Sequence, residues 1–270
     1  MTPPPAARTS ALMLVDSHCH LNYPGLVENQ LAVIARARAA GVGAMVSIST
    51  RESEWGDVLG AAERHADVFA TIGIHPHEAD QHAHITAERL IAECEHPRVV
   101  GIGESGLDFH YDHSARDAQR TLFRAHIAAA RATQLPLVIH TRDAEEDTAA
   151  ILREEMAAGA FPALIHCFTA SRAFAETVLP LGLYISLSGI VTFKKSIELQ
   201  SIARDLPLDR LLVETDAPFL APQPVRGKTC EPAHVAMTAA FVAGLRGITP
   251  GELAAATTDN FHRLFTRARS

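Results

Sequence analysis

Short apolar runs alternate with longer, alanine-rich amphipathic stretches along the whole of this 270-residue chain. Apolar runs of this length, separated by helices, are typical of βαβ units in a parallel sheet. The strand-like runs occupy residues 11–15, 43–48, 67–73, 98–103, 136–140, 162–166, 183–188 and 210–215. The helix candidates occupy 26–40, 51–65, 84–95, 114–133, 143–158, 171–179, 195–204, 231–246 and 250–266. Eight alternations predict an α/β fold, a single-domain TIM (β/α)8 barrel.

The barrel is expected to occupy residues 12–270. Residues 1–11 begin MTPPPAARTS and have no apolar segment, so they predict a disordered lead-in rather than a signal peptide. An open, doubly wound sheet is the alternative fold. No apolar run reaches the roughly 18 residues of a membrane span, so we expect no membrane partner.

The net charge of −7, with histidine neutral, argues against a strongly basic groove for duplex DNA. Non-specific affinity for DNA comes from Lys and Arg that neutralise phosphates. The four cysteines are far apart and form no CxxC pair, so neither a zinc ribbon nor a disulfide framework is expected. Reduced thiols without an export signal predict a cytoplasmic protein, and no obligate protein partner is evident.

Ionisable residues stand where the strand-like runs end. The C-terminal ends of all strands surround one mouth of a barrel, where enzymes of this fold keep their active sites. Residues far apart in the sequence should therefore converge there. The six that we expect to meet are His18, His20, Glu104, His140, His166 and Asp216.

These six side chains predict a metal centre. His18 and His20 are two residues apart, so an extended backbone points both rings the same way, towards one ion. Each histidine alone has an ordinary structural explanation. The presence of all six ionisable side chains at one end of the barrel is hard to explain as packing, because buried ionisable groups are costly unless they are paired or metal-bound. The set is too large for one tetrahedral zinc. It suits two divalent cations about 3.5–4 Å apart that share a water of lowered pKa, with Glu104 as the bridge.

The donor types accept Mg, Mn, Zn, Co or Ni, and the sequence does not choose among these metals. Glu214 lies two residues before Asp216, so we expect it to point to the same side and to orient a metal ligand.

At these residues the chain resembles the TatD family of metal-dependent hydrolases, within the amidohydrolase-like metallo-barrels. The resemblance covers residues 14–265. It rests on the segments VDSHCHLNYP (15–24), GIHPHEA (73–79), VGIGESGLDFHY (100–111), LPLVIHTRDA (135–144), HCFTAS (166–171), SLSGIVTFK (186–194), LLVETDAPFLAP (211–222), RGKTCEPAHV (226–235) and NFHRLF (260–265). It implies a TIM barrel that binds two divalent metals and hydrolyses phosphodiester bonds in DNA.

The resemblance also implies a role for each residue. The first-metal ligands correspond to His18, His20 and Asp216, the bridging carboxylate to Glu104, and the second-metal ligands to His140 and His166. The shared water then attacks phosphorus, and Asp216 accepts its proton, so Asp216 and Glu104 are the expected catalytic residues. We favour a 3′–5′ exonuclease on single-stranded DNA or a short oligonucleotide, because a deep mouth admits a strand end and a single strand avoids the cost of unpairing.

Other residues near the strand ends are candidates for substrate contact. His75 could donate a hydrogen bond to a phosphate oxygen, or belong to a proline turn. Arg142 could clamp a phosphate bidentately or pair with Asp143. Arg226 and Lys228, in the loop 221–230, could meet a nucleic-acid backbone or remain solvated.

The chain departs from the family pattern near the mouth. The family usually has Arg or another residue at the position of Thr229, and Asn at the position of Cys230. It commonly has Tyr at the position of Phe219. These changes bear on substrate preference rather than on hydrolysis.

Two other functions remain open. One is an amidohydrolase or lactonase acting on a small molecule; many such relatives carry a lysine at the fourth strand end, where this chain has Glu104. The other is a catalytically inactive metal-binding protein, against which the complete ligand set argues.

Overall fold

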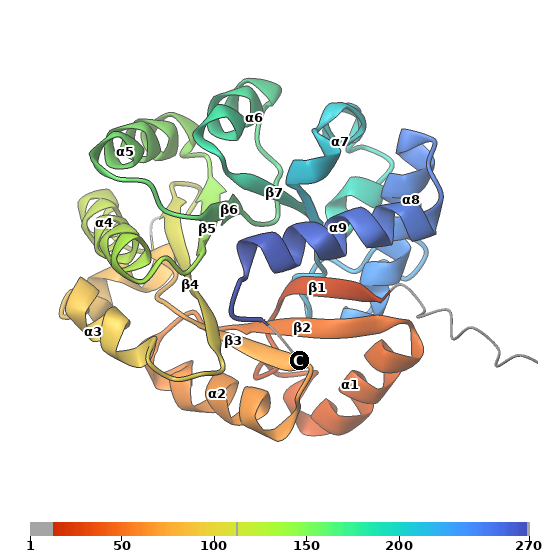
Figure 1. The fold of residues 1–270 in the computed structure, drawn as a ribbon, viewed down its shortest axis with the longest axis horizontal. Helices are drawn as coiled ribbons and strands as arrows, with labels where there is room; N and C mark the ends of the chain where they lie inside the picture. Colours follow the sequence, from red (N-terminus) through yellow and green to blue (C-terminus); the bar gives the residue numbers. More distant parts are fainter. Residues whose placement is uncertain (1–12, 112, 269–270) are drawn as a thin grey trace, which may run out of the picture.

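The computed structural model describes residues 13–111 and 113–268, so the lead-in predicted for residues 1–11 lies outside the described residues. Eight parallel strands form one sheet in chain order, with helices around it (Figure 1). The strands are β1 (Leu14–Cys19), β2 (Val42–Ile48), β3 (Val68–Ile72), β4 (Val99–Asp108), β5 (Leu137–Arg142), β6 (Ala163–Ile165), β7 (Tyr184–Leu187) and β8 (Leu211–Val213).

The helices between the strands cover the outside of the sheet (Figure 1). They are α1 (Gln30–Ala39), α2 (Trp55–Arg64), α3 (Ala87–Glu93), α4 (Arg116–Thr133), α5 (Glu145–Ala158), α6 (Arg172–Val178), α7 (Ile197–Asp205), α8 (Val235–Arg246) and α9 (Pro250–Leu264). None of these helices in the described ranges is long and apolar enough to cross a membrane. The four cysteines are free.

The sheet closes on itself between its first and last strands. The backbone N–H of Asp216 donates to the carbonyl of His18 at 2.9 Å, and that of His20 donates to the carbonyl of Ala217 at 2.7 Å. The Ser17 hydroxyl adds a bond of 3.1 Å to the carbonyl of Val213. The TIM barrel prediction is confirmed, and the open sheet is excluded.

The barrel interior is a packed core rather than a pore. Strand side chains that point inward, such as Val46, Val100 and Val138, are fully buried in one apolar cluster. Phe261 and Phe265, at the end of α9, join this cluster near the beginnings of the strands. In Figure 1, α9 crosses the barrel beside β1. Because that end is filled, only the carboxyl ends of the strands leave room for a ligand.

One strand is longer than the sequence predicts. The apolar run ends at residue 103, whereas β4 continues to Asp108 and pairs with β5 through Gly106 and His140. A Cβ at Gly106 would lie 2.0 Å from the His140 carbonyl oxygen, and its φ of +143° is one that glycine tolerates. The glycine-rich stretch therefore continues the strand because it allows the backbones to approach, although its residues are not those of a typical strand.

Candidate metal centre

A cavity of about 750 Å³ opens at the carboxyl ends of the strands. Its wall contains charged, imidazole and aromatic side chains from the ends of most strands. Five of the six predicted metal ligands line it: His20, Glu104, His140, His166 and Asp216. The sixth, His18, is fully buried directly behind them.

Four donor atoms form one compact group. His18 Nε2 lies 3.3 Å from His20 Nε2, 3.4 Å from Glu104 Oε2 and 3.5 Å from Asp216 Oδ1. His20 Nε2 lies 3.4 Å from the same Asp216 oxygen. Ligands held about 2.1 Å from a central ion at tetrahedral angles are roughly 3.4 Å apart. The spacing of these donors therefore fits one divalent cation.

A second group of donors lies on the other side of the same carboxylate. Glu104 Oε1 is 2.7 Å from His166 Nε2 and 3.0 Å from His140 Nδ1, and these two nitrogens are 3.3 Å apart. His75 Nε2 approaches Glu104 Oε1 to 3.5 Å. These distances are compatible with a second cation that has fewer protein ligands and space on the cavity side.

Glu104 is the only one of the six that belongs to both groups. Its Oε2 faces His18 in β1, and its Oε1 faces His140 in β5 and His166, which follows β6. Burial alone would raise the pKa of Glu104, but the neighbouring His166 and His75 hold it well below its usual value. The carboxylate is therefore ionised at neutral pH, which is the form that can bridge two ions.

Asp216 and His18 in the first group are also in their ligating protonation states, whereas burial of His20 is outweighed by its hydrogen bond to Asp216, which raises the pKa of His20 above its usual value. Burial raises the pKa of Asp216, but the hydrogen bond from His20 leaves it below its usual value. Burial, together with the adjacent His166, lowers the pKa of His18. A carboxylate and a neutral imidazole are the forms that bind a metal.

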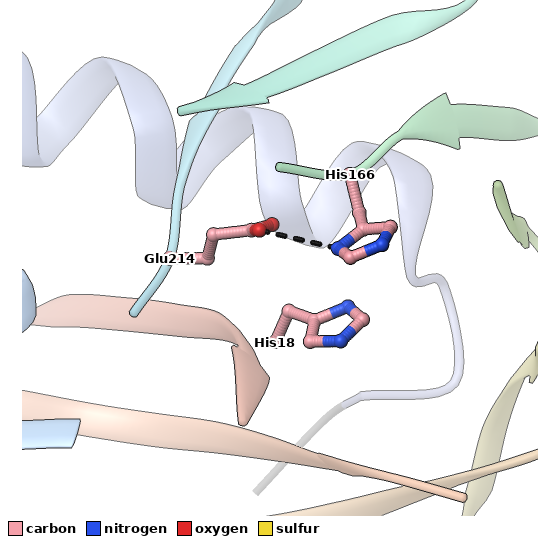
Figure 2. A group of neighbouring side chains, drawn as sticks. All are labelled: His18, His166 and Glu214. Carbon is pink, nitrogen blue, oxygen red and sulfur yellow. Dashed lines mark hydrogen bonds and ion pairs between the residues drawn. The ribbon is translucent and has the colours of Figure 1, made fainter. Parts of the chain in front are cut away.

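Glu214 lies beside His166 and His18 (Figure 2). Its Oε1 accepts a hydrogen bond from the Cys167 backbone N–H at 2.8 Å and lies 3.3 Å from His166 Nδ1. The His18 and His166 rings are stacked with centroids 3.9 Å apart, so one nitrogen of each and a Glu214 oxygen fall within 4.8 Å of one another. Since His166 already presents Nε2 to Glu104, Glu214 fits the role of a carboxylate that orients a metal-binding imidazole.

Asp108 supports His140 in the same way. Its Oδ2 lies 3.0 Å from His140 Nε2 and 2.9 Å from His77 Nε2. Burial raises the pKa of Asp108, but His140 and His77 leave it well below its usual value. The ionised carboxylate favours the His140 tautomer that presents Nδ1 to Glu104. The sequence prediction did not include Asp108, because it follows a glycine-rich stretch that was not expected to continue β4.

The backbone around the centre is strained at several positions, including two at or beside the metal ligands. Asp216 and Cys167 have φ of 59° and 43°, in the left-handed region that residues other than glycine seldom adopt. Hydrogen bonds between neighbouring segments hold both turns, including those from Thr215 to the buried Asp16 carboxyl group at 2.6 and 2.8 Å. Strain of this kind persists where the surrounding structure fixes it, and it is concentrated at functional sites.

The structure brings two of the four predicted substrate contacts to the cavity. His75 and Arg142 line it. The Arg142 guanidinium lies 5.0 Å over the Tyr111 ring, while Asp143 bonds to His110 instead. His75 Nδ1 also accepts a hydrogen bond from the backbone N–H of His77. The His75 side chain therefore both caps a turn and faces the site.

Arg226 and Lys228 are exposed, and among the described residues neither lines the cavity. The Arg226 guanidinium instead covers the Phe193 ring at 4.2 Å. Their contact with substrate stays a prediction. Of the three departures from the family pattern, Phe219 lines the cavity, whereas Cys230 is buried and Thr229 is exposed outside the lining.

Comparison with known proteins gives one consistent result. A family model described as TatD related DNase matches residues 15–266. The chain is 42% identical to the Escherichia coli K12 protein named uncharacterized metal-dependent hydrolase YcfH, over 94% of this chain and 96% of that protein. It is 35% identical to the Citrobacter koseri protein named 3′-5′ ssDNA/RNA exonuclease TatD, over 93% and 98% of the two chains. The crystal structure of the Escherichia coli TatD homologue YjjV superimposes with a TM-score of 0.88 at 29% identity, over 95% and 98%.

Proposed function

Because this chain belongs to the TatD family of metal-dependent hydrolases, we propose that it is a deoxyribonuclease that removes nucleotides from the 3′ end of single-stranded DNA. Its membership of the family makes it an enzyme, and metal-dependent hydrolysis follows from the names of its relatives. The relative named a 3′-5′ ssDNA/RNA exonuclease supports the polarity and the single-stranded substrate.

One observation carries the proposal. The two oxygens of the buried Glu104 carboxylate face two separate groups of donors, one around His18 and one around His140. A carboxylate in this position can bridge two divalent cations, of Mg, Mn, Zn, Co or Ni. Pairs of divalent ions about 3.5–4 Å apart are typical of enzymes that hydrolyse phosphate esters.

The residues that would hold the cations are His18, His20, Glu104, His140, His166 and Asp216. Bound divalent cations act as Lewis acids on a phosphoryl oxygen and lower the pKa of a coordinated water towards neutrality. Asp216 lines the cavity with an ionised carboxylate, so it is placed to accept the proton of the attacking water. The water oxygen bonds to phosphorus, the P–O3′ bond breaks, and the proton passes from Asp216 to the leaving 3′ oxygen.

Side chains at the cavity wall position the substrate. Arg142 is exposed, lines the cavity and can donate two parallel hydrogen bonds to a phosphate. His75 Nε2 faces Glu104 and can donate to a phosphate oxygen that lies beside it. Arg226 and Lys228 would meet only parts of a strand that extend outside the cavity. The net charge of −7 disfavours tight binding of duplex DNA. The positive charges of Arg142, Arg226 and Lys228 offset it locally around the site. The cytoplasmic location stays a prediction.

The proposal is tested with single-stranded DNA labelled at either end. Wild-type protein with Mg²⁺ or Mn²⁺ should release mononucleotides first from the 3′ end. His140→Ala and Asp216→Asn should each lower kcat/KM by roughly 10³-fold, because a lost ligand or proton acceptor removes several kcal/mol of transition-state stabilisation. Asp67→Asn, which alters only a surface pair with Arg38, should have the wild-type rate.

Wild-type rates in both variants would contradict the mechanism. Hydrolysis of lactones or cyclic amides, with no turnover of phosphodiesters, would instead support the amidohydrolase alternative.

A further inference from the structure

Two aromatic rings with large exposed surface border the metal cavity. Tyr111 is 44% exposed and Phe219 is 50% exposed, and both line the cavity. The other Phe, Tyr and Trp side chains in the described ranges 13–111 and 113–268 are buried or partly buried. A single apolar ring at a protein surface needs no explanation. Two in the same cavity, beside the residues that carry the chemistry, indicate a ligand with flat apolar faces.

The two rings lie on opposite walls of the cavity. Tyr111 follows β4 and Phe219 follows β8, and the eight strands of the barrel are in chain order. Strands four places apart in an eight-stranded barrel face each other across its axis. The neighbours agree with this placement: Phe219 lies near His20, after β1, while Tyr111 lies near Arg142, at the end of β5. Glu104 and the other candidate metal ligands therefore lie between the two rings.

The Phe219 ring is held by its neighbours but not covered by them. Its centroid is 6.3 Å from that of His20 and 6.1 Å from that of Tyr23, with interplanar angles of 66° and 84°. Both contacts are edge-to-face, and half of the side chain remains exposed. Among the described aromatic rings, none is stacked flat on Phe219, so a planar group of the substrate can occupy that place.

The opposite wall combines a ring with a cation. The Arg142 guanidinium lies over Tyr111 at 5.0 Å, and the His113 ring is stacked on Tyr111 with centroids 5.4 Å apart. No ion-pair partner for Arg142 is found within the described part of the chain. An arginine stacked on an aromatic ring offers both a planar surface and a positive charge. Arg51 also lines the cavity, but Glu54 and Glu78 pair with it.

Aromatic faces together with local positive charge are the surfaces that proteins use to bind single-stranded nucleic acid without sequence preference. We propose that Phe219 on one wall and Tyr111 with Arg142 on the other stack the two bases that flank the scissile phosphate. This inference rests on the proposed function. It makes the two rings determinants of substrate class, because each recognises a base on one side of the bond that is cut.

The test uses short single strands in which the terminal or the penultimate 3′ nucleotide is replaced by a base-free tetrahydrofuran analogue of its sugar. The variants are Phe219→Leu and Tyr111→Leu, with Phe241→Leu as a matched exchange on α8, outside the cavity lining. On the intact strand each cavity variant should lose roughly tenfold in kcat/KM, mainly through KM, since base stacking contributes about this factor. Tyr111→Phe, which keeps the ring, should lose little.

The effect of removing each base shows which ring stacks on which base. The loss caused by Phe219→Leu should disappear when one of the two bases is removed, and that caused by Tyr111→Leu should disappear when the other is removed. Equal losses on the intact and the doubly base-free strand, or no loss at all, would overturn the inference while wild-type cleavage still supports the proposed function. A wild-type protein that releases no nucleotide from any strand would refute the proposed function, and this inference with it.

Discussion

Replacing Glu214 should weaken metal binding without removing a side chain that touches an ion. The carboxylate is fully buried, and its Oε1 serves both the Cys167 N–H at 2.8 Å and His166 Nδ1 at 3.3 Å. The contact with Nδ1 keeps Nε2 of the same ring facing Glu104. Loss of a carboxylate that orients a metal-binding imidazole typically lowers metal affinity by roughly 10- to 100-fold.

Two substitutions at Glu214 should differ in size. Glu214→Gln keeps an oxygen acceptor in place and removes only the charge, so we expect about a tenfold loss of affinity at the site of His166. Glu214→Ala leaves two buried donors unpaired, and each costs about 1–3 kcal/mol. We therefore expect a loss of affinity near 100-fold, together with a decrease of roughly 2–6 kcal/mol in the free energy of unfolding.

Calorimetric titration of the metal-free protein with Mn²⁺ measures the affinity of each ion, and urea unfolding in the presence of a chelator measures stability. Glu231→Gln is the matched control, because its carboxylate also accepts two hydrogen bonds, from Arg36 at the surface. It should bind both ions with wild-type constants. If Glu214→Ala also binds both ions with wild-type constants, the supporting role of Glu214 is refuted.

Three further predictions follow from the packing and the charges. Gly106→Ala should cost roughly 3 kcal/mol or more and weaken metal binding, because its Cβ would lie 2.0 Å from the His140 carbonyl oxygen; a wild-type urea midpoint would contradict this. Burial raises the pKa of Glu155, but Arg131 and Arg124 leave it below its usual value, so its stabilisation is present above about pH 4.3 and is lost as the pH falls. Glu155→Gln should therefore cost about 1 kcal/mol at pH 7 and little near pH 3, and equal costs at both values in urea unfolding would argue against the pairing. Chelation should lower the melting temperature, since each ion at 100 times its Kd adds about 2.7 kcal/mol; the same melting curve with EDTA and with Mn²⁺ would exclude such binding to the folded state.

The sequence predicts the barrel and the convergence of the six side chains for one physical reason. Alternating apolar runs and helices predict parallel strands, and parallel strands in a barrel have all their carboxyl ends at one mouth. His18 and His166 are far apart along the chain, yet their rings are stacked with centroids 3.9 Å apart. The spacing of His18 and His20 also predicts that both rings face the same point, and their Nε2 atoms are 3.3 Å apart.

Details that depend on local backbone geometry are not predicted. Asp108 belongs to the site because Gly106 lets β4 approach β5 closely, and this approach has no signature in hydrophobic periodicity. Glu214 was expected to point to the same side as Asp216, but the φ of 59° at Asp216 breaks the alternation of an extended strand. Glu214 therefore contacts His166 from behind, while Asp216 lines the cavity.

Anomalous diffraction from crystals of the protein grown with Mn²⁺ tests the pairing of two ions most directly. We expect two peaks about 3.5–4 Å apart on either side of the Glu104 carboxylate, one beside His18, His20 and Asp216 and the other beside His140 and His166. A single peak, or peaks that do not contact Glu104, would contradict this expectation.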